Sequence, residues 1–144
     1  MRYIITIALL ITLAIPVTAQ DDCTTSDIQT AALLIAPIVS DFTAMGTELS
    51  GQMDDQDIIL EYFAQASDTQ YNWLFEIKPS IPQCNELNPL IITVDDLTAA
   101  FPTGLFNLYI GNTDRFEDYM QLSIDSMEDI TVIATDLMGE LDND

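Results

Sequence analysis

The sequence contains no histidine and very few basic residues, and each absence excludes classes of function. Among 144 residues there are 24 aspartates and glutamates but only three lysines and arginines, so the formal net charge at pH 7 is -21. Without imidazole there is no histidine to act as a general base, proton shuttle, haem ligand or zinc ligand. Nucleic acid and anionic membrane surfaces are bound through clustered lysine and arginine, so we expect neither as a partner.

Familiar catalytic motifs are also missing. The chain has no G-x-S-x-G, no phosphate-binding glycine loop, no H-E-x-x-H and no C-x-x-C-H. Carboxylate pairs can act as acid and base when burial separates their pKa values. The nearest candidate, Glu61, is expected to face away from Ile59 and Phe63 and to stay solvated. We therefore expect no enzyme activity and no cofactor.

The first residues have the pattern of an export signal. Arg2 precedes a short apolar run over residues 3–15, and residues 17–19 form a small-residue pattern of the A-x-A kind. The run is shorter than the roughly 20 apolar residues that span a membrane. We predict a signal peptide over residues 1–19, cut after Ala19, and a secreted or periplasmic protein.

The chain has two cysteines, Cys23 and Cys84, and we expect them to form a disulfide. Export places them in an oxidising compartment, where paired cysteines usually oxidise. Two thiols without histidine make a poor zinc site, and their spacing excludes a C-x-x-C redox pair. Acidic residues precede Cys23, which does not fit a lipidated cysteine.

Apolar residues recur at helical spacing throughout the rest of the chain. These stripes predict an all-α fold, an antiparallel bundle of three to four helices in a single domain over residues 20–144. The expected helices span residues 26–50, 55–78, 94–110 and 114–140. A hairpin of the first two would return the chain to its starting end, where Cys23 and Cys84 would meet.

Caps and prolines refine these boundaries. Ser26 with Gln29 matches a capping box, and Thr93 is the expected N-cap of the third helix. Pro37 is expected to kink or split the first helix, because proline removes a backbone donor. Pro102 leaves the continuity of the third helix open.

Carboxylates are the only abundant metal ligands, yet no window has the alternating oxygen pattern of a calcium loop. The best local cluster is Asp54, Asp55 and Asp57, in a turn between helices. A solvated acidic surface with first-turn capping explains the cluster equally well. These three residues are weak metal candidates, and diffuse cation binding is the broader expectation.

Methionines and aromatic residues are the remaining candidates for a site. Met45, Met120 and Met127 lie on the predicted seams, where they favour core packing over copper binding. Trp73 lies on a stripe and is expected in the core. Tyr71 lies outside it and is the candidate for an exposed recognition patch.

The leading hypothesis is an exported, non-enzymatic acidic bundle that acts through its surface. Its partner would be a protein, an envelope component or a second copy. One alternative is an acidic protein that binds calcium or general cations or is adapted to salt, because salt screens the repulsion among its charges. The other is a small-ligand carrier with a pocket between helices kinked at Pro37 and Pro102.

Overall fold

Helices make up nearly all of residues 22–141, the part of the chain that this computed structural model describes, and no strand occurs there. In chain order the elements are α2 (Thr25–Leu49), α3 (Gln56–Asn72), the π-helical turn η1 (Trp73–Ile77), the 3-10 turns η2 (Lys78–Ser80) and η3 (Asn85–Leu87), α4 (Asn88–Tyr109) and α5 (Thr113–Leu141). The all-α prediction is confirmed. The predicted signal peptide lies outside the described residues.

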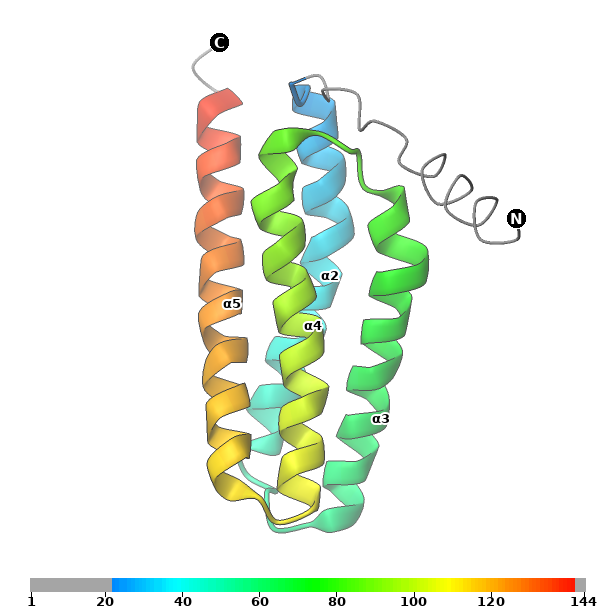
Figure 1. Cartoon of the computed structure of the whole chain (residues 1–144), viewed down its shortest axis with the longest axis vertical. Coiled ribbons are helices and arrows are strands. Elements are labelled where there is room, and N and C mark those ends of the chain that lie inside the picture. Colours follow the sequence, from blue (N-terminus) through cyan, green and yellow to red (C-terminus); the bar gives the residue numbers. More distant parts are fainter. Residues whose placement is uncertain (1–21, 142–144) are drawn as a thin grey trace, which may run out of the picture.

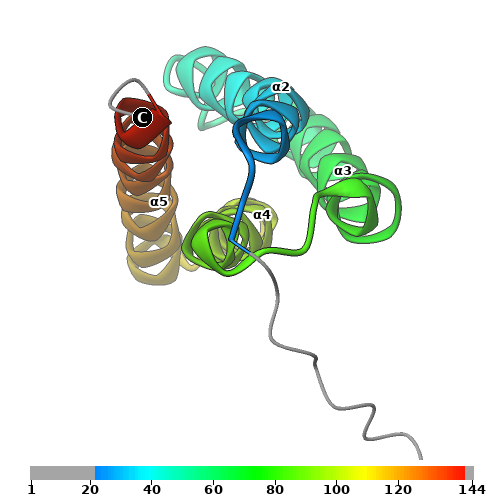
Figure 2. The ribbon, with the colours of Figure 1, turned by 90° about the horizontal axis from the view of Figure 1, so that it is seen from above.

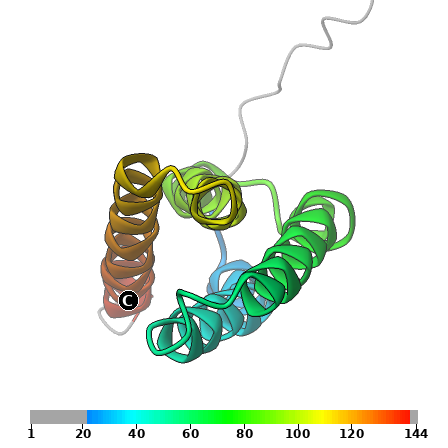
Figure 3. The same ribbon diagram turned by 90° about the horizontal axis from the view of Figure 1, so that it is seen from below.

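The long helices run alternately down and up one common axis (Figure 1). Seen from either end, α4 lies between α3 and α5, and α2 lies across from it (Figures 2 and 3). The helix α4 packs extensively against both α3 and α5. It is therefore the central element of the fold.

The predicted apolar stripes form one core. Phe42, Trp73 and Phe101 are fully buried, and the rings of Phe42 and Phe101 lie 4.9 Å apart. Each long helix contributes residues at helical spacing, which confirms the periodicity: Ile28, Ile35 and Leu49; Ile59 and Ala66; Val94, Leu97 and Leu105; Ile130 and Leu137.

The capping box at the start of α2 is formed by Thr24 and Asp27, so the prediction of Ser26 with Gln29 was wrong. The Asp27 amide donates to Thr24 Oγ1 at 3.3 Å, and the Thr24 amide donates to Asp27 Oδ2 at 2.9 Å. Both sequence patterns fit a box. A carboxylate is the stronger acceptor at the positive end of a helix, which favours Asp27.

Neither internal proline interrupts its helix. Pro37 lies inside α2 and Pro102 inside α4. Pro37 does not split α2, and α4 is continuous through Pro102. Pro37 is exposed, so water can solvate the Leu33 carbonyl that proline leaves without its usual donor.

The start of α4 was predicted six residues too late. The helix begins at Asn88, with Pro89 in its first turn, and the hydroxyl of the predicted cap Thr93 donates to the Pro89 carbonyl at 2.9 Å. Proline is favoured in a first turn because its missing amide would have had no partner there. The end of α4 agrees with the prediction: Gly111 follows it with a left-handed φ of 78°.

The predicted disulfide is present. Cys23 and Cys84 are bonded, with Cα atoms 5.3 Å apart, and the Cys23 amide donates to Glu86 Oε2 at 3.1 Å. The bridge ties the residue preceding α2 to the segment between α3 and α4. This contact fixes the upper ends of these helices in Figure 1 relative to one another.

Candidate functional site

An apolar groove of about 670 Å³ lies between α2 and α5. From α2 it is lined by Ala32, Ile35, Ala36, Val39, Ser40, Thr43 and Ala44. From α5 it is lined by Ile130, Thr131, Ala134, Thr135 and Met138, and Leu90 of α4 completes the lining. Its lining is mostly apolar and carries no charged residue.

The groove is open because the facing side chains are short. Most of the residues on its walls are alanine, serine or threonine. At one end of the groove the two helices touch, where Thr43 Oγ1 lies 3.5 Å from the sulfur of Met127. The helix α5 packs mainly against α4 and makes few contacts with α2, so the space between α2 and α5 stays open in the described chain.

The threonine hydroxyls of the lining already donate to backbone carbonyls of their own helices. Thr43 donates to the Val39 carbonyl at 2.7 Å, Thr131 to the Met127 carbonyl at 3.0 Å and Thr135 to the Thr131 carbonyl at 2.7 Å. No lining residue carries a charge. The groove can therefore accept apolar groups, but it presents few donors to a carboxylate or phosphate.

The two cations of the described chain are remote from the groove or paired. Lys78 Nζ lies 2.6 Å from Asp95 Oδ2 in the only ion pair found between residues 22 and 141. Arg115 is in the first turn of α5, about 22 Å along the helix from Ile130. An anionic group bound in the groove would thus have no cation beside it.

The carboxylates of α2 face α3 and not the groove. Asp41 and Glu48 line a second depression together with Gln65 and Thr69 of α3, and only Ala44 borders both hollows. Glu48 also accepts a hydrogen bond of 2.7 Å from the Tyr62 hydroxyl, which raises the pKa of Tyr62. On the other wall, Glu128 is exposed one turn before Thr131. The α2 wall of the groove is therefore neutral, and an exposed carboxylate lies near the α5 wall.

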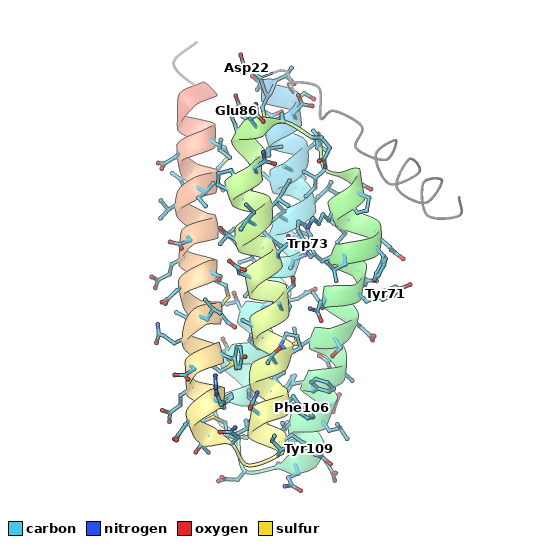
Figure 4. All side chains as sticks on the ribbon, in the orientation of Figure 1. Asp22, Tyr71, Trp73, Glu86, Phe106 and Tyr109 are labelled. Atoms are coloured by element: carbon cyan, nitrogen blue, oxygen red, sulfur yellow. A yellow bond between two sulfur atoms is a disulfide. The ribbon has the colours of Figure 1, made fainter. Side chains whose placement is uncertain are left out.

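A polar contact inside the bundle involves Asp95, whose role the sequence did not indicate. The Trp73 indole donates to Asp95 Oδ1 at 2.7 Å, while Lys78 holds the other oxygen. Trp73 begins the π-helical turn η1 and Lys78 directly follows it. The wider turn places both side chains on the side of the helix that faces Asp95. Figure 4 shows Trp73 turned between α3 and α4. This contact satisfies a buried indole and joins two helices.

The predicted metal candidates do not form a cluster. Asp55 caps α3, its Oδ1 accepting from the amides of Asp57 at 3.0 Å and Ile58 at 3.3 Å. Asp54 and Asp57 are exposed. In the described part of the chain, the only close group of three ligand-type residues is Cys23, Cys84 and Glu86, and its two sulfurs form the disulfide.

The methionines and aromatic residues lie at the depths that the apolar periodicity predicted. Met45 is buried, and Met120 and Met127 are half-buried against the core. Tyr71 is 57% exposed on the outer side of α3, and its ring lies 4.7 Å from that of Phe75, which is 65% exposed (Figure 4). This pair forms an exposed aromatic surface on α3.

The composition of α2 is unusual for a helix at the surface. No charged residue occurs between Asp27 and Asp41. It is the one described helix long and apolar enough to cross a membrane, and a third of its most apolar window is buried in the bundle. A helix in the core of a soluble protein has the same length and composition.

Comparison with protein-family models, curated proteins and solved structures gave no match for this chain.

Proposed function

We propose that this chain is an exported, non-enzymatic binding protein that receives the apolar part of a partner in the groove between α2 and α5. The observation that carries the proposal is the neutral lining of that groove in a chain with 24 carboxylates. Transfer of a methylene group from water to such a surface is worth about 0.8 kcal/mol. A ligand that places several methylene groups there gains appreciable affinity.

The absence of enzyme activity is proposed from the chemistry of the lining. Its threonine hydroxyls donate to backbone carbonyls, and a hydroxyl needs an adjacent base to act as a nucleophile. Export is proposed from the signal-peptide pattern of residues 1–19. The Cys23–Cys84 disulfide supports it, because such bonds persist in oxidising compartments.

Binding of Nile red, an uncharged dye whose emission shifts to the blue in apolar surroundings, tests the proposal. The disulfide-bonded protein should bind it with a blue shift, and Ala36→Trp, which fills the groove, should weaken binding at least tenfold. Ala64→Trp is the matched control, because Ala64 is exposed on α3 away from the groove. Equal binding by both variants would overturn the proposal.

The exposed aromatic pair Tyr71 and Phe75 is another surface that could take up the dye. Phe75→Ser removes half of that surface and leaves the groove unchanged. If this variant loses the dye signal while Ala36→Trp keeps it, the binding surface lies on α3 instead of between α2 and α5.

A further inference from the structure

We infer that Met138 is a site of oxidation by peroxides, and that its conversion to methionine sulfoxide lowers the affinity of the groove between α2 and α5 for apolar ligands. This inference rests on the proposed function and adds the regulation of the same site. It follows from the exposure of Met138, from its place in the lining and from the hydrogen bonds of the residues around it.

Met138 is open to solvent and also forms part of the groove. It lies near the end of α5 and is 47% exposed, so a small oxidant dissolved in water can reach its sulfur. Met53, between α2 and α3, is similarly exposed at 44% but does not line the groove. Met45 is buried in the core. The chain thus offers an exposed control and a buried control for Met138.

The reaction changes an apolar part of the wall into a polar one. The thioether sulfur attacks one oxygen of hydrogen peroxide, and the S–O bond forms as the O–O bond breaks. The sulfur loses two electrons, and the second oxygen leaves as water with both protons. The product, methionine sulfoxide, is polar and can be reduced back to methionine by sulfoxide reductases, so the change is reversible.

The residues around Met138 offer no free side-chain donor to the new oxygen. On the α5 wall, the hydroxyls of Thr131 and Thr135 already donate to carbonyls of their own helix. The helix α2 begins at the end of the bundle where α5 ends (Figure 1), and the first residues of its lining, Ala32 and Ile35, have no side-chain donor. Water would therefore solvate the sulfoxide in the free groove. An apolar ligand over Met138 would displace that water and leave the oxygen unpaired, which opposes binding.

Treatment with hydrogen peroxide followed by Nile red binding tests the inference. The peroxide is removed before the dye is added, peptide mass spectrometry measures the sulfoxide at each methionine, and circular dichroism checks that the fold is retained. Met138 and Met53 should oxidise well before the buried Met45. Conversion of Met138 should weaken dye binding at least fivefold.

Variants assign the effect to one position. Met138→Leu keeps the wall apolar without a thioether there, so it should bind the dye within twofold of the parent and keep that affinity after treatment. Met53→Leu is the matched control and should lose affinity on treatment as the parent does. Met138→Gln adds a polar side chain of similar length without any oxidant and should bind at least fivefold more weakly than the untreated parent. Met53→Gln should change binding less than twofold.

Three results would overturn the inference. Undiminished dye binding with Met138 fully converted would show that the groove tolerates the sulfoxide. Loss of binding by treated Met138→Leu would assign the effect to another residue. Conversion of Met138 no faster than that of Met45 would show that its sulfur is not accessible. In each of these cases the untreated protein still binds the dye, and the proposed function stands. Failure of the untreated protein to bind the dye would contradict the proposed function itself, and the inference with it.

Discussion

The two sides of α5 differ in how closely they are packed. Toward α4 the packing is tight: a Cβ atom added at Gly104 would lie 3.2 Å from Tyr119 Cβ and 3.3 Å from the Met120 sulfur. Toward α2 the same helix leaves a groove of about 670 Å³. Close packing on one side is enough to hold α5, so the other side is free to present a binding surface.

The same difference distinguishes residues that stabilise the fold from residues that form the proposed binding surface. The residues of α4 that face the core are almost fully buried, Phe101 and Leu105 among them, whereas Ala36 and Thr43 on the groove are exposed. Substitutions on the two sides should therefore have different consequences. Those at α4 should change the free energy of unfolding, and those at the groove should change binding.

Phe101→Ala is the substitution with the largest expected effect. Phe101 is fully buried against Phe42, so the loss of its ring leaves a cavity, and the free energy of unfolding should fall by about 4 kcal/mol. Val39→Ala in the groove should cost less than about 1 kcal/mol, because the site is only partly buried. Urea unfolding followed by circular dichroism measures both. If Phe101→Ala does not fold, Phe101→Leu should still lower the free energy of unfolding more than Val39→Ala does. The reverse order would contradict the view that α4 is tightly packed and the groove is not.

Enlarging a small side chain on each side of the comparison tests the difference in packing by adding atoms and not by removing them. Gly104→Leu forces atoms into the α4–α5 contact and should destabilise the fold by about 2 kcal/mol. Ala36→Leu extends into the open groove and should stay within about 0.5 kcal/mol of the parent. Thermal melts of the two variants provide the measurement. A similar loss in both would mean that the groove is as tightly packed as the α4 contact.

Periodicity was sufficient to predict which side of each helix is buried. Ile28, Ile35, Phe42 and Leu49 recur every seven residues and are all buried, because burial of one apolar stripe is what holds a helix in a bundle. The disulfide was also predictable, because export, cysteine count and the hairpin geometry led to the same pair. At these positions the helical periodicity and the cysteine pairing expected from the sequence are the ones found in the fold.

The groove was not predictable from periodicity. Its residues, such as Ala32, Val39 and Ala134, belong to or adjoin the predicted stripes, and only the arrangement of α2 relative to α5 decides whether they are covered. The run without charge between Asp27 and Asp41 was an available signal. The role of Asp95 was missed because the third helix was expected to begin after Thr93, which placed Asp95 in a solvated first turn, whereas α4 begins at Asn88.

Trp73→Phe should have an intermediate effect on stability. Phenylalanine keeps most of the buried ring but loses the donor to Asp95, and a hydrogen bond of this kind contributes about 1 kcal/mol. Asp95 is about one-third exposed, so water can replace part of the lost bond. Urea unfolding by circular dichroism measures the loss, and Nile red binding at the groove should not change. A change in dye binding would show that the α3–α4 contact and the groove are coupled.

Added NaCl should raise the melting temperature by a few degrees, because it screens repulsion among the carboxylates. The neutral groove contributes no charge, so Ala36→Trp should respond as the parent does. Stabilisation by calcium at concentrations far below those of magnesium would indicate a specific cation site. A flat response to NaCl would contradict the expectation of salt dependence.

The capping box of α2 should give the smallest effect, visible only at low pH. The Thr24 hydroxyl and amide donate to Asp27 and hold the pKa of that carboxyl below its ordinary value of 3.8. A carboxyl whose pKa is lower in the folded state stabilises the fold above its unfolded-state pKa and loses this contribution as the pH falls through the lowered value. The melting temperatures of the parent and Asp27→Asn should therefore differ at pH 7 and converge as the pH falls through the lowered pKa of Asp27, because the other carboxyls titrate equally in both proteins.

This prediction bears on the groove as well, because α2 forms one of its walls. Asp27 lies more than one turn before Ala32, the first residue of the lining. Loss of the cap should fray the first turn of α2, while the disulfide at Cys23 and the buried residues from Ile28 onward hold the rest of the helix. Nile red binding by Asp27→Asn at pH 7 should then equal that of the parent. A loss of dye binding would show that the groove depends on the end of α2 and not only on its contacts with α4.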